Sequence, residues 1–295
     1  MKKLRISLRY LLYCSILVLL NSYAISSSSN SLLWNVAGKG LEYPIYLSGS
    51  LHALPANEFI IYEKVNEILS ESNLVVFEVN LLQPDLAQRA RERMLMKDIT
   101  LDQLLNSDDF EKLKLFVEDS LSLTMSALNK VKPLLFSSFL VPKLLGTQPA
   151  SYDYYFLQKA QELSIELNGL ETVDEQFDHF DAIPLSDQAQ ILMESICNFE
   201  EQRKTYFNLV ELYKLQDIEG IYNLTISMSA EYPAFKENVL HKRNEKWIPR
   251  IIDLCTNRSC FLVFGAAHLA GNNGVIELLR KTGYTVEPVE LKLPE

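Results

Sequence analysis

No stretch of this sequence is apolar for long enough to cross a membrane as a helix. The first apolar run covers residues 10–20, and the second, residues 134–145, is interrupted by Pro142 and Lys143. A membrane-spanning helix needs about 20 consecutive apolar residues. The second run therefore predicts a buried helix, with a lipid-facing surface as the alternative.

Basic residues and cysteines are also scarce. The 295 residues include 28 Lys plus Arg against 38 Asp plus Glu, a net charge of −10. A protein that binds nucleic acid needs a positively charged surface, so this balance argues against such a role. The four cysteines lack the second closely spaced pair that a cysteine-based zinc site requires.

Two of the cysteines, Cys255 and Cys260, are separated by a short polar stretch that is typical of a turn. In an oxidising compartment they could form a disulfide, and two free thiols are the alternative. The sequence alone leaves both states open.

The N-terminus has the order of a secretory signal. Four basic residues precede the apolar run at residues 10–20, and Ser22-Tyr23-Ala24 follows it. We expect cleavage after Ala24, so that residues 1–24 are the signal peptide, with an uncleaved anchor as the alternative. The protein would then be exported, periplasmic or secreted, without a transmembrane span. Residues 25–31 have the serine-rich composition of a flexible linker.

What the sequence does contain is one eight-residue pattern near each end. The first, IYLSGSLH, ends at His52, and the second, FLVFGAAH, ends at His268. Each apolar run predicts a buried strand, and the motif glycines, Gly49 and Gly265, mark places where the backbone turns or closely approaches another group. Both histidines then follow strand ends, where open α/β sheets bind their ligands. A single histidine there is more often structural, and the repetition brings a ligand role level with the structural one.

A carboxylate joins the two histidines. Residues 74–79 are apolar except for Glu78, and a charge in a buried strand needs an opposite charge or a bound cation. Two histidines and a carboxylate are a common ligand set for a catalytic divalent metal. His52, Glu78 and His268 are therefore the predicted metal ligands, with Mn, Co or Zn as the candidate cations.

With these residues the chain resembles a known family, the TraB/GumN proteins, whose animal members include the Tiki metalloproteases. The resemblance covers nearly all of the chain after residue 30, and its specificity lies in short segments that occur together and in order. Besides the two motifs, the matching positions are Leu33 to Val36, Pro44 to Pro55, Phe77 to Val79, Asp153, Gly169 to Thr172, Gln176, Arg243, Asn244, Trp247, Leu269, Gly271 and Gly274. Lys242 and Tyr152 depart from the pattern, which expects an acidic residue and a glycine there.

The resemblance implies an α/β fold shared with the erythromycin-esterase and ChaN-like proteins. It also implies a metal-dependent hydrolase, in particular a peptidase, that uses the paired motifs. The strand, helix and strand order of residues 45–79 likewise indicates a central, mostly parallel sheet flanked by helices. We expect one α/β domain over residues 32–295. Two helical blocks, about 84–150 and 186–240, would form a cap inserted between the two motifs.

Two further residues are candidates for catalysis. Glu171 follows a predicted strand, residues 165–170, and is the candidate general base; a helix N-terminal carboxylate is the alternative. Arg243 shares a helix face with Trp247 and is the candidate transition-state stabiliser. A surface ion pair is the alternative for this arginine.

For four other residues the sequence predicts a place in the structure but no part in the site. Pro249 is expected to kink or restart the helix over residues 236–255, because proline lacks a backbone N–H. His179 and His241 lie among charged residues and are expected to be ordinary surface residues. Cys197 is expected to lie buried in a helix.

Two other functions fit the same residues. The fold also serves haem- or ligand-binding proteins, so the histidines could hold a cofactor without hydrolysis. A regulatory binder with a degenerate site is a third function, against which the intact motifs argue. Peptides, esters and lactone-like rings all contain a carbonyl that the site could polarise, so the expected partner is a peptide or small carbonyl substrate. The oligomeric state stays open.

Overall fold

The computed structural model describes residues 30–292 of the chain. The predicted signal peptide and the first five residues of the predicted linker lie outside the described residues. Ser31, the last linker residue, is buried; its hydroxyl donates to the Val289 carbonyl at 2.6 Å and accepts from the Leu33 N–H at 3.0 Å. The folded domain therefore includes Ser31, one residue earlier than the sequence predicts.

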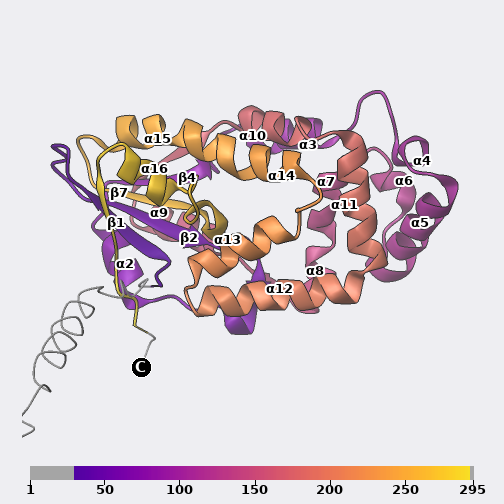
Figure 1. Ribbon diagram of the computed structural model, residues 1–295, viewed down its shortest axis with the longest axis horizontal. Coiled ribbons are helices and arrows are strands. Elements are labelled where there is room, and N and C mark those ends of the chain that lie inside the picture. Colours follow the sequence, from indigo (N-terminus) through magenta and orange to yellow (C-terminus); the bar gives the residue numbers. More distant parts are fainter. Residues whose placement is uncertain (1–29, 293–295) are drawn as a thin grey trace, which may run out of the picture.

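A six-stranded sheet occupies one end of the elongated molecule (Figure 1). The strands, in sheet order, are β6 (Glu166–Glu171), β4 (Leu74–Val79), β7 (Cys260–Gly265), β2 (Ile45–Ser50), β1 (Leu33–Ala37) and β8 (Thr285–Pro288). The first four run parallel, β1 is antiparallel to β2, and β8 is antiparallel to β1. The predicted mostly parallel sheet is confirmed.

The two central strands β4 and β7 are buried along nearly their whole length, and apart from Glu78 they are apolar, as expected where both faces of a sheet are covered. All six residues of β4 are buried, and so are the first five of β7. Four helices pack beside the sheet: α2 (Glu63–Ser70), α9 (Tyr152–Glu162), α15 (Lys242–Cys255) and α16 (Val275–Lys281). A two-stranded sheet of β3 (Leu54–Pro55) and β5 (Pro149–Ala150) lies apart from the main one.

The other end of the molecule is a helical lobe with its own hydrophobic core (Figure 1). Its helices are α3 (Leu86–Met94), α4 (Leu101–Leu104), α5 (Ser107–Leu121), α6 (Met125–Leu128), α7 (Pro133–Phe136), α8 (Val141–Leu145) and α11 (Leu185–Cys197). Between the lobe and the sheet lie α10 (Val173–Asp181), α12 (Phe199–Lys214), α13 (Ile218–Ser227) and α14 (Pro233–Lys236). All these helices fall between the two Gly-x-x-His motifs in the sequence, which confirms the inserted helical cap.

The long helix before β7 differs from its prediction. Pro249 does not restart it, because α15 is continuous from Lys242 to Cys255. The carbonyl that Pro249 leaves unpaired belongs to Glu245, and both residues are exposed, so water can satisfy it. The irregular segment lies earlier, in a π-helix, η3 (Glu237–His241). Such segments are frequent at functional sites, and this one ends two residues before Arg243.

Three of the structural interpretations are wrong. His179 and His241 are buried, not on the surface: His179 contacts the Lys246 ammonium at 3.2 Å, and His241 hydrogen-bonds Tyr222 at 3.2 Å. Burial and the Lys246 charge lower the pKa of His179 to about 4. Cys197 is exposed at the end of α11. A charged sequence neighbourhood did not reveal which helix face packs against another element.

Cys255 and Cys260 are buried beside each other as free thiols. The hydrogen bond to Cys260, together with burial, raises the pKa of the Cys255 thiol well above its ordinary value. A disulfide between them stays a prediction. In the part of the chain from residue 30 to 292, no helix is both long enough and apolar enough to span a bilayer.

Candidate functional site

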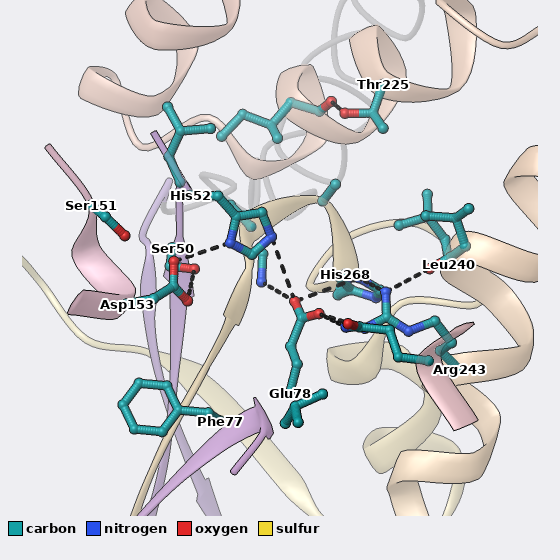
Figure 2. A pocket seen from close by; sticks show the side chains of 18 of the residues that line it. Ser50, His52, Phe77, Glu78, Ser151, Asp153, Thr225, Leu240, Arg243 and His268 are labelled. Carbon is teal, nitrogen blue, oxygen red and sulfur yellow. Dashed lines mark hydrogen bonds and ion pairs between the residues drawn. The ribbon is translucent and has the colours of Figure 1, made fainter. Parts of the chain in front are cut away.

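The carboxyl ends of three adjacent strands, β4, β7 and β2, bring the predicted metal ligands together. His52 follows the end of β2 by two residues, Glu78 is the penultimate residue of β4, and His268 ends η4 (Ala266–His268), directly after β7. Figure 2 shows His52 and His268 on opposite sides of the Glu78 carboxylate. This crevice beyond the strand ends is where open α/β sheets place their ligands.

The three side chains point at a common space above Gly265. The Nε2 atoms of His52 and His268 each lie 3.9 Å from Glu78 Oε1, and the Gly265 N–H donates to the same oxygen at 2.9 Å. A Cβ placed on Gly265 would lie 3.5 Å from His52 Nε2 and 3.6 Å from Glu78 Oε1. Because Gly265 has no side chain, a small space remains there, which we call the cradle. The side chains of His52, Glu78 and His268 border it.

The first motif needs its glycine for a different contact. A Cβ on Gly49 would lie 2.7 Å from Leu269 Cδ1 and 3.1 Å from the Ala266 Cβ. Neither Gly49 nor Gly265 has a positive φ. The requirement is therefore close approach between the two motifs, not backbone freedom, and the packing keeps the two histidine-bearing loops at a constant separation.

Asp153 holds His52. The Asp153 Oδ2 atom lies 3.0 Å from His52 Nδ1, and Ser50 donates to Asp153 Oδ1 at 3.2 Å. The His52 side chain is 66% exposed, yet the surrounding protein atoms desolvate the ring and oppose its protonation. The Asp153 hydrogen bond and the Asp153 and Glu78 charges outweigh this effect and raise the His52 pKa to about 9. With Nδ1–H donated to Asp153, the Nε2 atom faces Glu78 and the crevice.

His268 is held by an amide instead of a carboxylate. Its Nδ1 lies 2.6 Å from Asn244 Oδ1, and the Asn244 amide donates to the Asn273 carbonyl at 2.8 Å, which orients its oxygen toward the ring. Burial lowers the pKa of His268 to about 3, so the ring is neutral at pH 7. Nδ1–H then donates to Asn244, and the Nε2 lone pair accepts a long contact of 3.4 Å from Arg243 Nη1.

Arg243 neutralises the buried carboxylates. Its side chain is 3% exposed, and it donates to Glu78 Oε2 through Nη2 and to Glu171 Oε1 through Nη2 and Nε, the latter two at 2.7 and 3.0 Å. Burial opposes ionisation of Glu78, yet the Arg243 and histidine charges hold its pKa well below the usual range. The surface ion pair considered for Arg243 is thereby excluded.

Glu171 lies behind Arg243, away from the crevice. Besides Arg243 it accepts a hydrogen bond from Trp247 Nε1 at 3.1 Å, and its side chain is 3% exposed. Burial raises its pKa, against the opposing effect of Arg243. It does not line the cavity that holds His52 and His268. Its predicted role as general base stays a prediction, and the geometry favours a role in positioning Arg243.

Three polar residues were not singled out as site residues by the sequence. Asp153 and Asn244 orient the histidines, and Gln176 donates to Glu78 Oε2 at 3.3 Å. They lie on α9, α15 and α10, far from their partners in the sequence. No local pattern marks them, and their match to the family resemblance was the only signal that could have found them.

The crevice opens into a cavity of about 590 Å³. Its floor carries the polar cluster, and its remaining wall is mostly apolar, including Leu51, Phe180, Leu209, Ile221 and Leu240. This size and composition are typical of small-molecule sites. The arrangement can position a carbonyl over the cluster while apolar surface surrounds the rest of the ligand.

The three side chains are of the types that bind divalent cations, but their donor atoms lie farther from one another than in a metal-bound site. Imidazole nitrogens and a carboxylate oxygen are typical ligands, and ligands about 2.1 Å from a tetrahedral cation lie about 3.4 Å apart. His268 is neutral, whereas His52, with a pKa of about 9, would have to release its Nε2 proton to bind a cation. The observed 3.9 Å is about half an ångström more. Among residues 30–292, no group of three or more His, Cys, Asp or Glu residues is already close enough to form a metal site.

Comparisons with known proteins agree with the resemblance read from the sequence. A sequence model of the TraB/PrgY/gumN family matches residues 32–288. Metalloprotease TIKI2 of Xenopus tropicalis is 24% identical over 88% of this chain and 60% of its own length. Metalloprotease TIKI1 of Danio rerio is 23% identical over 88% of this chain and 63% of its own length. The chain thus spans about three fifths of the length of these relatives.

Proposed function

The chain belongs to the TraB/PrgY/gumN family, and from that premise we propose that it is a metal-dependent hydrolase that cleaves peptides. The observation that carries the proposal is the convergence of both motif histidines on Glu78 at the floor of a cavity. The relatives named metalloproteases support a metal-dependent reaction.

We also propose that residues 1–24 direct export. N-terminal sequencing of the exported protein should then start at Ile25, and retained signal residues would contradict this proposal.

His52, Glu78 and His268 are the residues that would hold the cation, which would act there as a Lewis acid on the scissile carbonyl. The chain's own residues prepare this site. Asp153 and Asn244 hold the two rings so that both Nε2 atoms face the same point, an arrangement that raises metal affinity in other proteins. The charge of Arg243 keeps Glu78 ionised, as a ligand must be.

The positive charge of Arg243 affects the site more than its N–H groups do, because these groups already have partners. Its N–H groups already contact Glu78, Glu171, the Val239 carbonyl at 3.1 Å and His268 Nε2 at 3.4 Å. Stabilising charge that develops on a substrate oxygen would therefore require one of these contacts to be given up. The His268 contact is the longest, so Nη1 is the donor that we propose for this role.

The test is the metal content of residues 25–295 by elemental analysis, together with a peptide-library cleavage screen. We expect one divalent metal per chain after loading with manganese, cobalt or zinc, and cleavage that chelation abolishes. Absence of both binding and cleavage with all three metals would contradict the proposal. A visible absorption band on adding haem, without cleavage, would support the ligand-binding alternative.

Gly265→Ala should weaken metal binding without unfolding the protein. The new Cβ makes ordinary contacts of 3.5–3.6 Å, so the free energy of unfolding should change by less than about 1 kcal/mol. Because the methyl group fills the cradle between the donors, metal affinity should fall by a factor of about 10 or more. Equilibrium dialysis against the metal measures the affinity, and thermal unfolding measures stability.

Gly49→Ala is the comparison. Its Cβ would overlap Leu269 and press on Ala266, so it should cost stability, about 1–3 kcal/mol, and would affect metal binding only through the separation of the two loops, without entering the cradle. Unchanged metal affinity in Gly265→Ala would show that the cation does not occupy this space.

A further inference from the structure

We propose that the cavity binds an uncharged, apolar segment within a peptide chain, and that the cap helices select its apolar side chain. The inference rests on the proposed peptidase function, whose substrate class it narrows. It follows from two observations: the composition of the wall facing the polar cluster, and the pairing of the charged groups in the cavity.

The wall contributed by the cap carries no charge. Its lining residues are Leu209 from α12, Ile221 and Thr225 from α13, and Val239 and Leu240 from η3. Figure 2 shows Thr225 across the cavity from Glu78, with Leu240 beside Arg243. The Thr225 hydroxyl donates to the Ile221 carbonyl at 2.8 Å, so even this hydroxyl is used within its own helix. A ligand carbonyl placed over Glu78 therefore has apolar surface opposite it.

The opposite rim continues this surface. Leu51 and Ala267, inside the two motifs, line the cavity beside the histidines, and Leu81 and Phe180 line it on the side of β4 and α10. These four residues are only partly buried, so part of their apolar surface faces the cavity. A side chain adjacent to a bound carbonyl would meet apolar atoms from the sheet loops and from the cap.

The charged groups of the cavity are already paired. Among its described lining residues, the ionisable ones are His52, Glu78, Asp153, Arg243 and His268, and they contact one another. Among the lining residues that the structure describes, Arg243 is the one guanidinium and there is no lysine, and the N–H groups of Arg243 contact protein atoms. In the metal-free protein, a terminal carboxylate, or an Asp or Glu side chain, would lose its hydration here without gaining an unpaired protein cation.

The chemistry of a peptide chain leads to the same ligand class. A peptide with a blocked or distant C-terminus presents backbone amides, which can contact the polar floor, and side chains, which can contact the wall. An apolar side chain gains by leaving water, whereas an acidic one does not. The geometry therefore points to cleavage within an apolar segment and not to removal of C-terminal residues.

The experiment measures equilibrium binding of fluorescently labelled hexapeptides, acetylated and amidated, that differ only in a central Leu or Asp. Binding is measured by anisotropy with metal-free protein and repeated after metal loading. We expect the Leu peptide to bind at least about 10-fold more tightly than the Asp peptide, a discrimination that a hydrophobic pocket can supply. A third peptide, with Leu at a free C-terminus, should also bind at least about 10-fold more weakly than the blocked one.

Leu209→Lys places a cation in the wall and should reverse the preference, so that the Asp peptide binds more tightly than the Leu peptide. Leu209 is only partly buried, so the lysine ammonium can reach the cavity without unfolding α12. Leu215→Lys is the matched control: it makes the same change at the end of the same helix, where Leu215 is 66% exposed. Its preference should equal that of the wild type.

The outcomes separate this inference from the proposed function. Tighter binding of the Leu peptide, reversed by Leu209→Lys, supports the apolar site even if no peptide is cleaved. Cleavage without a Leu preference, or a preference that Leu209→Lys leaves unchanged, overturns the apolar site and leaves the hydrolase intact. Equal binding of all three peptides also overturns it.

Discussion

Replacing His52 and His268 together with alanine is expected to abolish metal binding and to lower peptide hydrolysis by a factor of at least about 10³. The two rings supply two of the three donors that face the cradle above Gly265, and Glu78 alone cannot hold a divalent cation against water. Metal content by elemental analysis and kcat/KM on a cleaved peptide are the measurements.

The double variant should still fold. The His52 side chain is 66% exposed, so its loss removes little packing. Loss of the buried His268 ring leaves Asn244 Oδ1 without its partner, which costs about 1–3 kcal/mol. His241→Ala is the control, because it also removes a buried ring with hydrogen-bonded partners but lies outside the crevice. It should retain metal and activity, whereas a fully active double variant would sink the proposed mechanism.

Arg243→Met should be the most destabilising single substitution at the site. It leaves Glu78 and Glu171 buried without their shared cation, and breaking a buried ion pair in this way costs about 3–5 kcal/mol. Chemical denaturation at pH 7.5 measures the loss. Arg250→Met, which breaks the half-exposed pair with Glu175, should cost only about 0–1 kcal/mol.

The stability lost in Arg243→Met should also depend on pH. Without Arg243, burial raises the pKa of both carboxyls above their unfolded values, so the folded variant binds more protons than the unfolded chain. Its stability then falls as the pH rises, and the difference from the wild type should be largest at neutral pH and shrink toward pH 4. Adding Glu171→Gln to Arg243→Met should restore part of the lost stability. Equal stability of Arg243→Met and wild type at pH 7.5 would show that the carboxylates do not depend on this arginine.

Much of the site could be predicted from residues 45–52, 74–79 and 261–268. Their apolar runs are local signals that predict buried strands, and β2, β4 and β7 form where these runs lie. Parallel strands carry their carboxyl ends to one edge of a sheet, so residues at those ends meet without further information. The position of the helical cap also followed from the sequence, because the helical segments lie between the motifs.

The tertiary structure alone decided the contacts between elements far apart in the chain. Asp153 meets His52 across 101 positions, and Arg243 meets Glu78 across 165, so no local period or spacing encodes either pair. The same reason explains why Glu171 faces Arg243 and not the cavity, and why His241 is buried. Strand identity and strand-end chemistry are properties of a few neighbouring residues, whereas the orientation of a ring or a guanidinium depends on which distant helix packs against it.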